Sequence, residues 1–269
     1  VAADLDDDAY TDVCFTQTND SAYGGSRTRS SRIYRGGPDG FTTARRIDVP
    51  ASPAFTVHAA DLNRDGCLDI VFLVMEKGKA LGIILCGGAD GYAANRKTIL
   101  PLLQKRMGGF QIADLNRDGC LDLIFTANYI GDMETFWGTK DGYSTQNREV
   151  FKVGAGMLAL ADLNGDGRLD FVIGGELDPQ TKCHTAPTRI YWGRPDGRPE
   201  PRPAFELECY EGGQLCIADL NRDGYFDIVQ SNYKTDNTRS FPVFIYWGGK
   251  DGKYLNSRRT ELPAESALG

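Results

Sequence analysis

The stretch DLNRDGCLD, residues 61–69, sets the pattern for the whole chain. The same nine-residue frame returns at residues 4–12, 114–122, 162–170 and 219–227, so that successive frames begin 48–57 residues apart. Internal repeats of this length are typical of arrays, solenoids and propellers. The fold of the chain therefore follows from what one repeat forms.

Each frame has the composition of a loop that binds a hard cation. Side chains with oxygen atoms stand at positions 1, 3, 5 and 9, and Gly stands at position 6 of four frames. Alternate side chains of such a loop point inward, Gly takes the sharp left-handed turn, and the carbonyl of position 7 adds one more oxygen. We predict up to five structural Ca²⁺ ions, one per repeat. The predicted ligands are Asp4, Asp6, Asp8, Tyr10, Asp12, Asp61, Asn63, Asp65, Cys67, Asp69, Asp114, Asn116, Asp118, Cys120, Asp122, Asp162, Asn164, Asp166, Arg168, Asp170, Asp219, Asn221, Asp223, Tyr225 and Asp227.

Two other interpretations of the frame are weaker. An EF-hand needs Glu at position 12, where this chain has Phe72 and Ile173, and helices rather than strands would flank the loop. Asx-rich turns without metal explain a single loop but not the same oxygens five times. The first frame has Ala9 in place of Gly. A left-handed Ala costs ~1 kcal/mol, so we expect this site to be weaker or distorted.

A second signature follows each frame. A strand-like run ending in an Asp-Gly turn occurs at residues 33–41, 84–92, 136–143, 190–197 and 245–252. This pattern predicts a strand that enters a hairpin. With one strand on each side of the acidic loop, every repeat supplies about four short strands, which is one propeller blade. Helical periodicity is absent, so we expect almost no helix.

We therefore predict an all-β fold, a single β-propeller domain over residues 1–269 with four-stranded antiparallel blades. The repeats are approximately 1–53, 54–106, 107–154, 155–211 and 212–269. Residues 261–269 followed by residues 1–4 match residues 49–61 in character, so we expect the two termini to share the inner strand of one blade. A closed ring of five blades leaves no open sheet edge. The alternative is a segment of a seven-bladed propeller.

The acidic frame and the Tyr-Trp-Gly-x-x-Asp-Gly hairpin resemble the FG-GAP/VCBS repeats of integrin α-subunits and many secreted bacterial proteins. Similar repeats occur in some fungal lectins and polysaccharide lyases. The resemblance covers essentially the whole chain and implies a calcium-binding β-propeller. It also implies seven blades as the usual number, from which five repeats depart.

Bulk composition limits partners and location. The net charge of −7 and the pI near 5.0 argue against nucleic acid as the main partner. No apolar run approaches the ~20 residues of a membrane span, and no signal-peptide pattern stands at the start. Because extracellular calcium fills even modest sites, we expect a secreted, periplasmic or cell-surface protein.

The seven cysteines cannot all pair with one another, which excludes a full disulfide framework. Most of them are expected to be small buried hydrophobic residues. Cys209 and Cys216 flank a Gly-Gly turn and are the one pair that we consider for a disulfide bond. Cys183 beside His184 offers too few ligands for a metal site.

Recognition is expected on the face opposite the calcium loops. The metal loops and the Asp-Gly turns share one face of a blade, whereas the opposite loops vary, being longest at 17–32, 174–188 and 230–242 and a stub at 76–79. Trp137, Trp192 and Trp247 share one strand position and are read as packing between blades. The candidate ligand-binding residues are Asn19, Asp20, Tyr23, Arg27, Arg29, Asn128, Tyr129, Asp132, Asn232, Tyr233, Lys234, Asp236 and Arg239.

These loops favour a binding or adhesion module for a glycan or protein ligand, because planar polar groups mixed with aromatic rings suit both. A scaffold domain of a larger extracellular assembly is the alternative. A polysaccharide lyase is the third hypothesis, with His184, Tyr129 and Arg189 as candidates that the sequence does not bring together. We expect no enzymatic activity, since no nucleophile triad, phosphate loop or dinucleotide motif is present.

Overall fold

The computed structural model describes residues 1–269 except 18–29, 50, 52, 89–90, 94, 105–106, 129–130, 155, 178–183, 234–240 and 265–269. The described residues form β-strands and two short 3₁₀ turns, Thr43–Arg45 and Thr145–Asn147. The all-β prediction is therefore confirmed. No helix in this part of the chain has the length and apolar character needed to cross a membrane.

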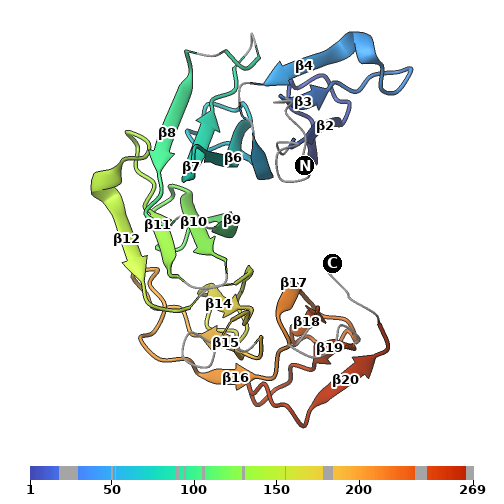
Figure 1. Ribbon diagram of the computed structural model, residues 1–269, viewed down its shortest axis with the longest axis vertical. Helices are drawn as coiled ribbons and strands as arrows, with labels where there is room; N and C mark the ends of the chain where they lie inside the picture. The colour runs from blue at the N-terminus through green and yellow to red at the C-terminus, as the bar shows by residue number, and fades with distance from the viewer. Residues whose placement is uncertain are drawn as a thin grey trace. The chain divides into compact units, whose positions relative to one another are not determined.

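The strands form five sheets of four strands, and we call each sheet a blade (Figure 1). Blade one contains β1 (Ala2–Ala3), β2 (Asp12–Phe15), β3 (Ser31–Tyr34) and β4 (Arg46–Val49). Blade two contains β5 (Ala54–Ala60), β6 (Asp69–Glu76), β7 (Lys79–Leu85) and β8 (Lys97–Pro101). Blade three contains β9 (Met107–Ala113), β10 (Asp122–Ala127), β11 (Met133–Phe136) and β12 (Arg148–Phe151). Blade four contains β13 (Leu158–Ala161), β14 (Asp170–Ile173), β15 (Thr188–Tyr191) and β16 (Phe205–Leu207), and blade five contains β17 (Gly212–Ala218), β18 (Asp227–Asn232), β19 (Val243–Tyr246) and β20 (Arg259–Leu262).

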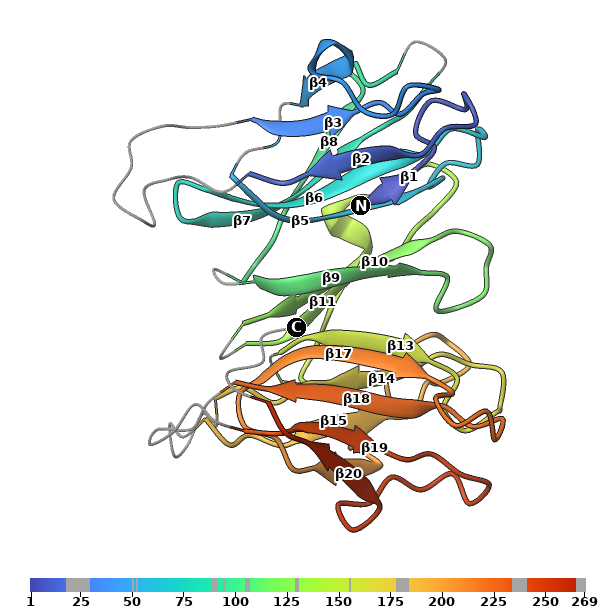
Figure 2. The same ribbon diagram turned by 90° about the vertical axis from the view of Figure 1, so that its right-hand side faces the viewer.

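Neighbouring strands of a blade are consecutive in the sequence and pair in antiparallel orientation, as β17 to β20 illustrate in Figure 2. Five four-stranded antiparallel blades agree with the predicted propeller architecture. The closing segment that we expect from the C-terminus includes residues 265–269, which lie outside the described residues, so closure stays a prediction.

The chain forms two compact units, residues 1–105 with 136–148 and residues 106–135 with 149–269. The first unit has a core between blades one and two, in which Leu5 and Ile33 pack with Ile70 and Phe72. The second has a core between blades four and five, in which Leu163 and Ile190 pack with Phe244 and Tyr254. In each core, two blades bury a face against each other, because a four-stranded sheet cannot cover its own faces.

The predicted stub in blade two is a two-residue hairpin. Lys77 and Gly78 join β6 to β7, with φ angles of 50° and 76°. Positive φ at both central residues is typical of the type I′ turn, whose twist matches that of the flanking strands. Blade two therefore presents little loop at this end.

The cysteine and tryptophan predictions have mixed outcomes. Cys209 and Cys216 are both free thiols, so the disulfide that we considered is not formed; Cys209 is buried and Cys216 is exposed. Cys183 lies outside the described residues. Trp192 packs against the core between blades four and five, as predicted. Trp247 donates a hydrogen bond of 2.9 Å to Thr260 within its own blade, and its packing between blades stays a prediction.

Candidate functional site

The five acidic loops share one backbone conformation. Position 6 has a positive φ in every loop, from 70° at Ala9 to 90° at Gly119, which confirms the predicted left-handed turn. Position 4 is also left-handed in every loop, for example at Arg64 and Arg117 with φ near 60°. The sequence gives no warning of this second turn, because non-glycine residues occupy position 4 in four of the five loops.

Hydrogen bonds to the acidic side chains hold this shape. In the second loop, Asp61 accepts bonds from the N–H groups of Asp65 and Gly66, at 3.1 and 3.0 Å. Asp65 in turn accepts a bond of 2.8 Å from the N–H of Cys67. The bonds from position 6 to position 1 and from position 7 to position 5 recur in all five loops. The side chains predicted as ligands thus surround one turn in each repeat.

The aspartate at position 9 joins each loop to the hairpin of its own blade. Asp69 is 1% exposed; its Oδ2 accepts a bond from the N–H of Leu62 and its Oδ1 accepts one from Gly87 in the Asp-Gly hairpin, at 3.1 and 2.8 Å. Blades one, four and five have the same pair of bonds. These bonds confirm that metal loops and Asp-Gly turns lie at the same end of a blade.

Carboxylates crowd together in the first loop. Among the described residues, only Asp4, Asp6 and Asp8 form an acidic group whose ligand atoms all lie within 4.8 Å of one another. Burial raises the pKa of Asp6, and the negative charge of Asp12 raises it further, while Arg35, 3.1 Å away, opposes both. The loop that we expected to be weakest therefore holds the densest negative charge.

The donor sets fit a hard cation. Asp6 Oδ1 and Asp114 Oδ1 are buried oxygens without a hydrogen-bond partner, a costly state for a carboxylate unless a cation is present. Burial also raises the pKa of Asp69, and that of Asp170 to about 6. In loop four, Arg168 forms an ion pair with Asp166, so that this loop already contains one positive charge. The predicted ligand sets and their occupancy by Ca²⁺ remain predictions.

A cavity of about 220 Å³ lies in the second unit at the opposite ends of the strands. Its lining comes from three blades, where β9, β13 and β17 begin and β10, β14 and β18 end. The metal loops occupy the other ends of the same strands. The lining residues are Gly108, Asn128, Met157, Glu176, Glu211, Gly212, Gly213, Gln214 and Tyr233.

Two buried carboxylates give this cavity its charge. Glu176 and Glu211 are each 7% exposed, and His184 Nδ1 lies 2.8 Å from Glu211 Oε2. The φ of Glu211 is 43°, a left-handed conformation that is strained for a residue other than glycine. Its N–H donates to the carbonyl of His184 at 3.0 Å. The fold thus holds Glu211 in a costly conformation beside the cavity.

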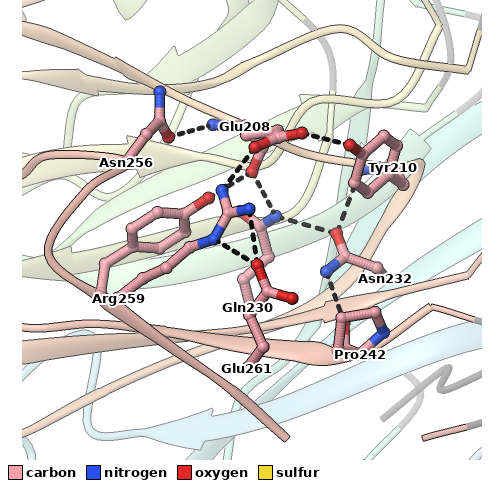
Figure 3. Close-up of polar contacts among 9 residues, drawn as sticks. Glu208, Tyr210, Gln230, Asn232, Pro242, Asn256, Arg259 and Glu261 are labelled. Carbon is pink, nitrogen blue, oxygen red and sulfur yellow. Dashed lines mark hydrogen bonds and ion pairs between the residues drawn. The ribbon is translucent and has the colours of Figure 1, made fainter. Parts of the chain in front are cut away.

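A polar network fixes the linker that carries Glu211 from β16 to β17 (Figure 3). Gln230 and Tyr246 both donate to the carbonyl of Glu208, at 3.2 and 2.6 Å. The Glu208 carboxylate accepts from Tyr210 and forms an ion pair with Arg259. Asn232 accepts a bond of 3.0 Å from the N–H of Tyr210. Because Gln230 and Asn232 are both 0% exposed, the linker is anchored from within blade five.

The structure brings only some of the predicted ligand-binding residues to the cavity. Asn128 and Tyr233 line it, whereas Asp132 forms an ion pair of 2.6 Å with Lys152. Asn232 is described but fully buried in the network of blade five and does not line the cavity. The other nine are not among the described residues: Asn19, Asp20, Tyr23, Arg27, Arg29, Tyr129, Lys234, Asp236 and Arg239. Sequence reasoning missed Glu176, Glu211 and Gln214. The sequence did contain one sign of a site near these residues. Gln230–Asn232 in β18 are polar, whereas the equivalent residues of β6, Phe72 to Val74, are apolar.

Two of the three predicted lyase residues, His184 and Arg189, are among the described residues. His184 contacts Glu211, Arg189 contacts Glu206 at 2.9 Å on the outer strands of blade four, and Tyr129 lies outside the described residues. Two of the three candidates thus have carboxylate partners of their own.

Comparison with known proteins agrees with this architecture. A family model described as an FG-GAP-like repeat matches residues 4–72, 114–173 and 162–230, together more than half of the chain. No curated protein matches the sequence.

Two solved structures are similar to this chain. One is a lectin of Agrocybe aegerita, described as specifically recognising non-reducing terminal N-acetylglucosamine; it has 15% identity and a TM-score of 0.58, over 95% of this chain and 64% of the lectin chain. The other is the biofilm matrix protein Bap1 of V. cholerae, with 16% identity and a TM-score of 0.52 over 100% of this chain and 38% of that protein. At these identities the likeness shows a shared fold. This chain spans less than two thirds of the length of either protein.

Proposed function

The chain belongs to the FG-GAP-like repeat family, and from this premise we propose that it is an extracellular, calcium-stabilised β-propeller module that binds a glycan or protein ligand at the strand ends opposite its acidic loops. The role proposed is binding rather than catalysis. The observation that carries the proposal is the difference between the two ends of the strands within a blade. Every repeat carries the same acidic loop at one end of its strands, whereas the opposite strand ends of blades three, four and five form a cavity.

Calcium fits the repeated end. The ion would be held by the side chains at positions 1, 3, 5 and 9 with the carbonyl of position 7, and it would neutralise carboxylates that otherwise repel one another. Asp6 Oδ1 and Asp114 Oδ1 support this assignment, since each is buried without a donor. The position-9 aspartates would then join the ion, the loop and the hairpin. An ion bound only by the folded chain stabilises it by mass action.

Binding fits the variable end. Asn128 and Gln214 offer amide donors and acceptors, Tyr233 offers an aromatic face, and Glu176 and Glu211 offer strong acceptors. The linker network holds Glu211 before any ligand arrives, which reduces the ordering cost of binding. A rigid cavity of this size accommodates one sugar ring or one small side chain of a partner. The lectin similarity in fold is compatible with the former.

A glycan array probed with the full chain tests the function. We expect binding to a defined set of glycans in calcium, loss of that binding in chelator, and loss in Tyr233→Ala. Glu206→Gln, which removes an ion pair with Arg189 between β15 and β16, serves as the control and should bind like the wild type. Absence of binding to every glycan would remove the glycan assignment. Incubation with acidic polysaccharides that released unsaturated ends would instead support a lyase.

A further inference from the structure

The fourth acidic loop, residues 162–170, differs from the second, third and fifth loops because a guanidinium group lies on its position-5 carboxylate. We propose that Arg168 is an internal counter-ion that competes with calcium for Asp166, so that this loop fills at a higher calcium concentration than those three loops. The inference rests on the proposed binding of calcium by the acidic loops. It adds the order in which they fill and the residue that sets this order.

The carboxylate at position 5 has a different partner in this loop. In the second, third and fifth loops, its Oδ2 accepts a bond of 3.0 Å from the amide of the asparagine at position 3. In the fourth loop, Oδ2 of Asp166 instead contacts the guanidinium of Arg168. A neutral amide can rotate and offer its oxygen to a cation, whereas a guanidinium has only donors and stays charged. Calcium must therefore displace Arg168 or bind beside a positive charge.

A second contact holds the guanidinium in place. Nε of Arg168 donates a bond of 2.8 Å to the carbonyl of Gly193, in the hairpin of the same blade. The guanidinium thus connects the loop to the hairpin, the two segments that Asp170 also joins. The Arg168 side chain is 35% exposed, whereas Arg64 and Arg222, at position 4 of the second and fifth loops, are exposed residues. Water and salt therefore screen the charge of Arg168 less than theirs.

A second guanidinium group lies beside the fourth loop. A Cβ placed at Gly167 would lie 3.3 Å from Nη2 of Arg117, a residue of the third loop. The Arg117 side chain therefore extends toward the left-handed turn at position 6 of the fourth loop. Positive groups beside a site repel a divalent ion. This second charge lowers the calcium affinity of the fourth loop further.

The backbone of the fourth loop is suited to a turn without an ion. Positions 4 and 6 are left-handed in every loop, and the fourth loop alone has glycine at both, Gly165 and Gly167, with φ angles of 73° and 85°. The second, third and fifth loops have arginine at position 4, where a Cβ is unfavourable. The fourth loop thus forms its turn without this strain, and Arg168 offsets part of its negative charge. Both features reduce the dependence of its shape on calcium.

Equilibrium dialysis of the full chain against calcium, with bound ions counted, tests the proposal. We expect Arg168→Gln to tighten the binding of one ion about tenfold and to leave the number of ions unchanged, because the competing charge is gone. Arg64→Gln is the matched control, since it removes an exposed arginine from the second loop. Arg64→Gln should change no affinity by more than about threefold.

Urea denaturation separates competition with calcium from a merely structural role. In chelator, Arg168→Gln should have a lower urea midpoint than the wild type, because the contacts with Asp166 and Gly193 are lost. This deficit should shrink as calcium is added, because the variant binds the ion more tightly and gains more from it. A deficit of the same size with and without calcium would show that Arg168 only connects the loop to the hairpin, which would overturn the proposal.

The reciprocal change tests the same idea in another blade. Cys67→Arg places an arginine at position 7 of the second loop, on the same chain position as Arg168 in the fourth loop. It should weaken the binding of one ion about tenfold. Cys67→Ser, which adds no charge, should bind calcium like the wild type. If Arg168→Gln fails to fold by circular dichroism, the comparison of these two variants still decides the question.

The outcomes distinguish this inference from the proposed function. Unchanged calcium affinities in a folded Arg168→Gln, or in Cys67→Arg where Arg168→Gln does not fold, would overturn the competition while leaving calcium binding by the acidic loops intact. Absence of bound calcium from the wild type and from every variant would instead remove the proposed calcium stabilisation itself.

Discussion

The N–H of Gly193 donates a hydrogen bond of 2.8 Å to Oδ1 of Asp170, and this bond joins the fourth acidic loop to the hairpin of the same blade. The other oxygen, Oδ2, accepts a bond of 2.9 Å from the N–H of Leu163. Asp170 is 0% exposed, so no water replaces either donor. The position-9 aspartate therefore has a structural role that does not depend on any metal ion.

Asp170→Asn separates this role from calcium binding. The amide group has one acceptor oxygen and would turn its NH₂ toward a backbone donor. We therefore expect a loss of roughly 1–3 kcal/mol of unfolding free energy even in chelator, measured by urea denaturation. Asn164→Ala is the matched control, because Asn164 is exposed and lies in the same loop. Asn164→Ala should reduce the stabilisation by calcium and leave the metal-free stability nearly unchanged. Identical metal-free stability of the two variants would argue against the structural bond.

Two glycines of one hairpin should respond differently to alanine. A Cβ at Gly248 would lie 2.1 Å from the carbonyl oxygen of Phe226, whereas a Cβ at Gly252 meets no atom within 4 Å. We expect Gly248→Ala to lower the unfolding free energy by about 2–3 kcal/mol, because the added Cβ would overlap the backbone of Phe226. Gly252→Ala, at a φ of 61°, should cost about 1 kcal/mol through backbone strain alone. Urea midpoints measure both, and equal costs would contradict the close approach at Gly248.

The first acidic loop should gain stability from glycine. Ala9 has a φ of 70°, where its Cβ is unfavourable and glycine is not. Ala9→Gly should therefore raise the unfolding free energy by about 0.5–1 kcal/mol. Gly66→Ala makes the reverse change at the same position of the second loop and should lower it by a similar amount. Thermal melts in calcium measure both variants. A destabilising Ala9→Gly would show that the left-handed turn is absent in solution.

The pH dependence of the metal-free protein should be opposite to that of calcium binding. Burial raises the pKa of Asp170 to about 6, and burial also raises the pKa values of Asp6 and Asp69. The folded chain therefore binds protons more tightly than the unfolded chain. The contribution of these groups to the unfolding free energy should fall as the pH rises from 4 to 7. Calcium binds the deprotonated carboxylates, so the stabilisation that it adds should grow over the same range. Melting temperatures with chelator and with calcium at several pH values measure this difference. A difference that is constant with pH would contradict the raised pKa values.

The fold could be predicted from the sequence because the residues that determine one blade all lie within one repeat. The acidic frame, the two flanking strands and the Asp-Gly hairpin lie within about fifty residues, and their contacts, such as Asp69 with Gly87, are local to one blade. Because the same pattern occurs five times, each copy strengthened the assignment of a blade to the others. The prediction that the acidic loops and the Asp-Gly turns share one end of a blade was likewise correct, because the order of strand, loop and strand determines the end at which each connection lies.

The cavity could not be predicted because it is assembled across blades. Asn128, Glu176, Glu211 and Tyr233 come from three repeats, and no spacing in the sequence relates them. Glu211 combines a left-handed φ with a hydrogen bond from its N–H to the carbonyl of His184, a tertiary contact. One local signal existed in β18, where Gln230, Ser231 and Asn232 interrupt an apolar strand pattern. Buried polar residues in such a slot indicate a network or a site.

Scanning calorimetry of the full chain, with bound calcium counted in the same samples, tests the central claim most directly. The account predicts several calcium ions per chain and a marked fall in melting temperature after thorough chelation, restored by calcium and not by magnesium. Because the position-9 bonds remain in chelator, the metal-free chain should still fold at low temperature. A chain that holds no calcium, or one whose melting curve is the same with and without the ion, would contradict the claim that the acidic loops stabilise the blades through calcium.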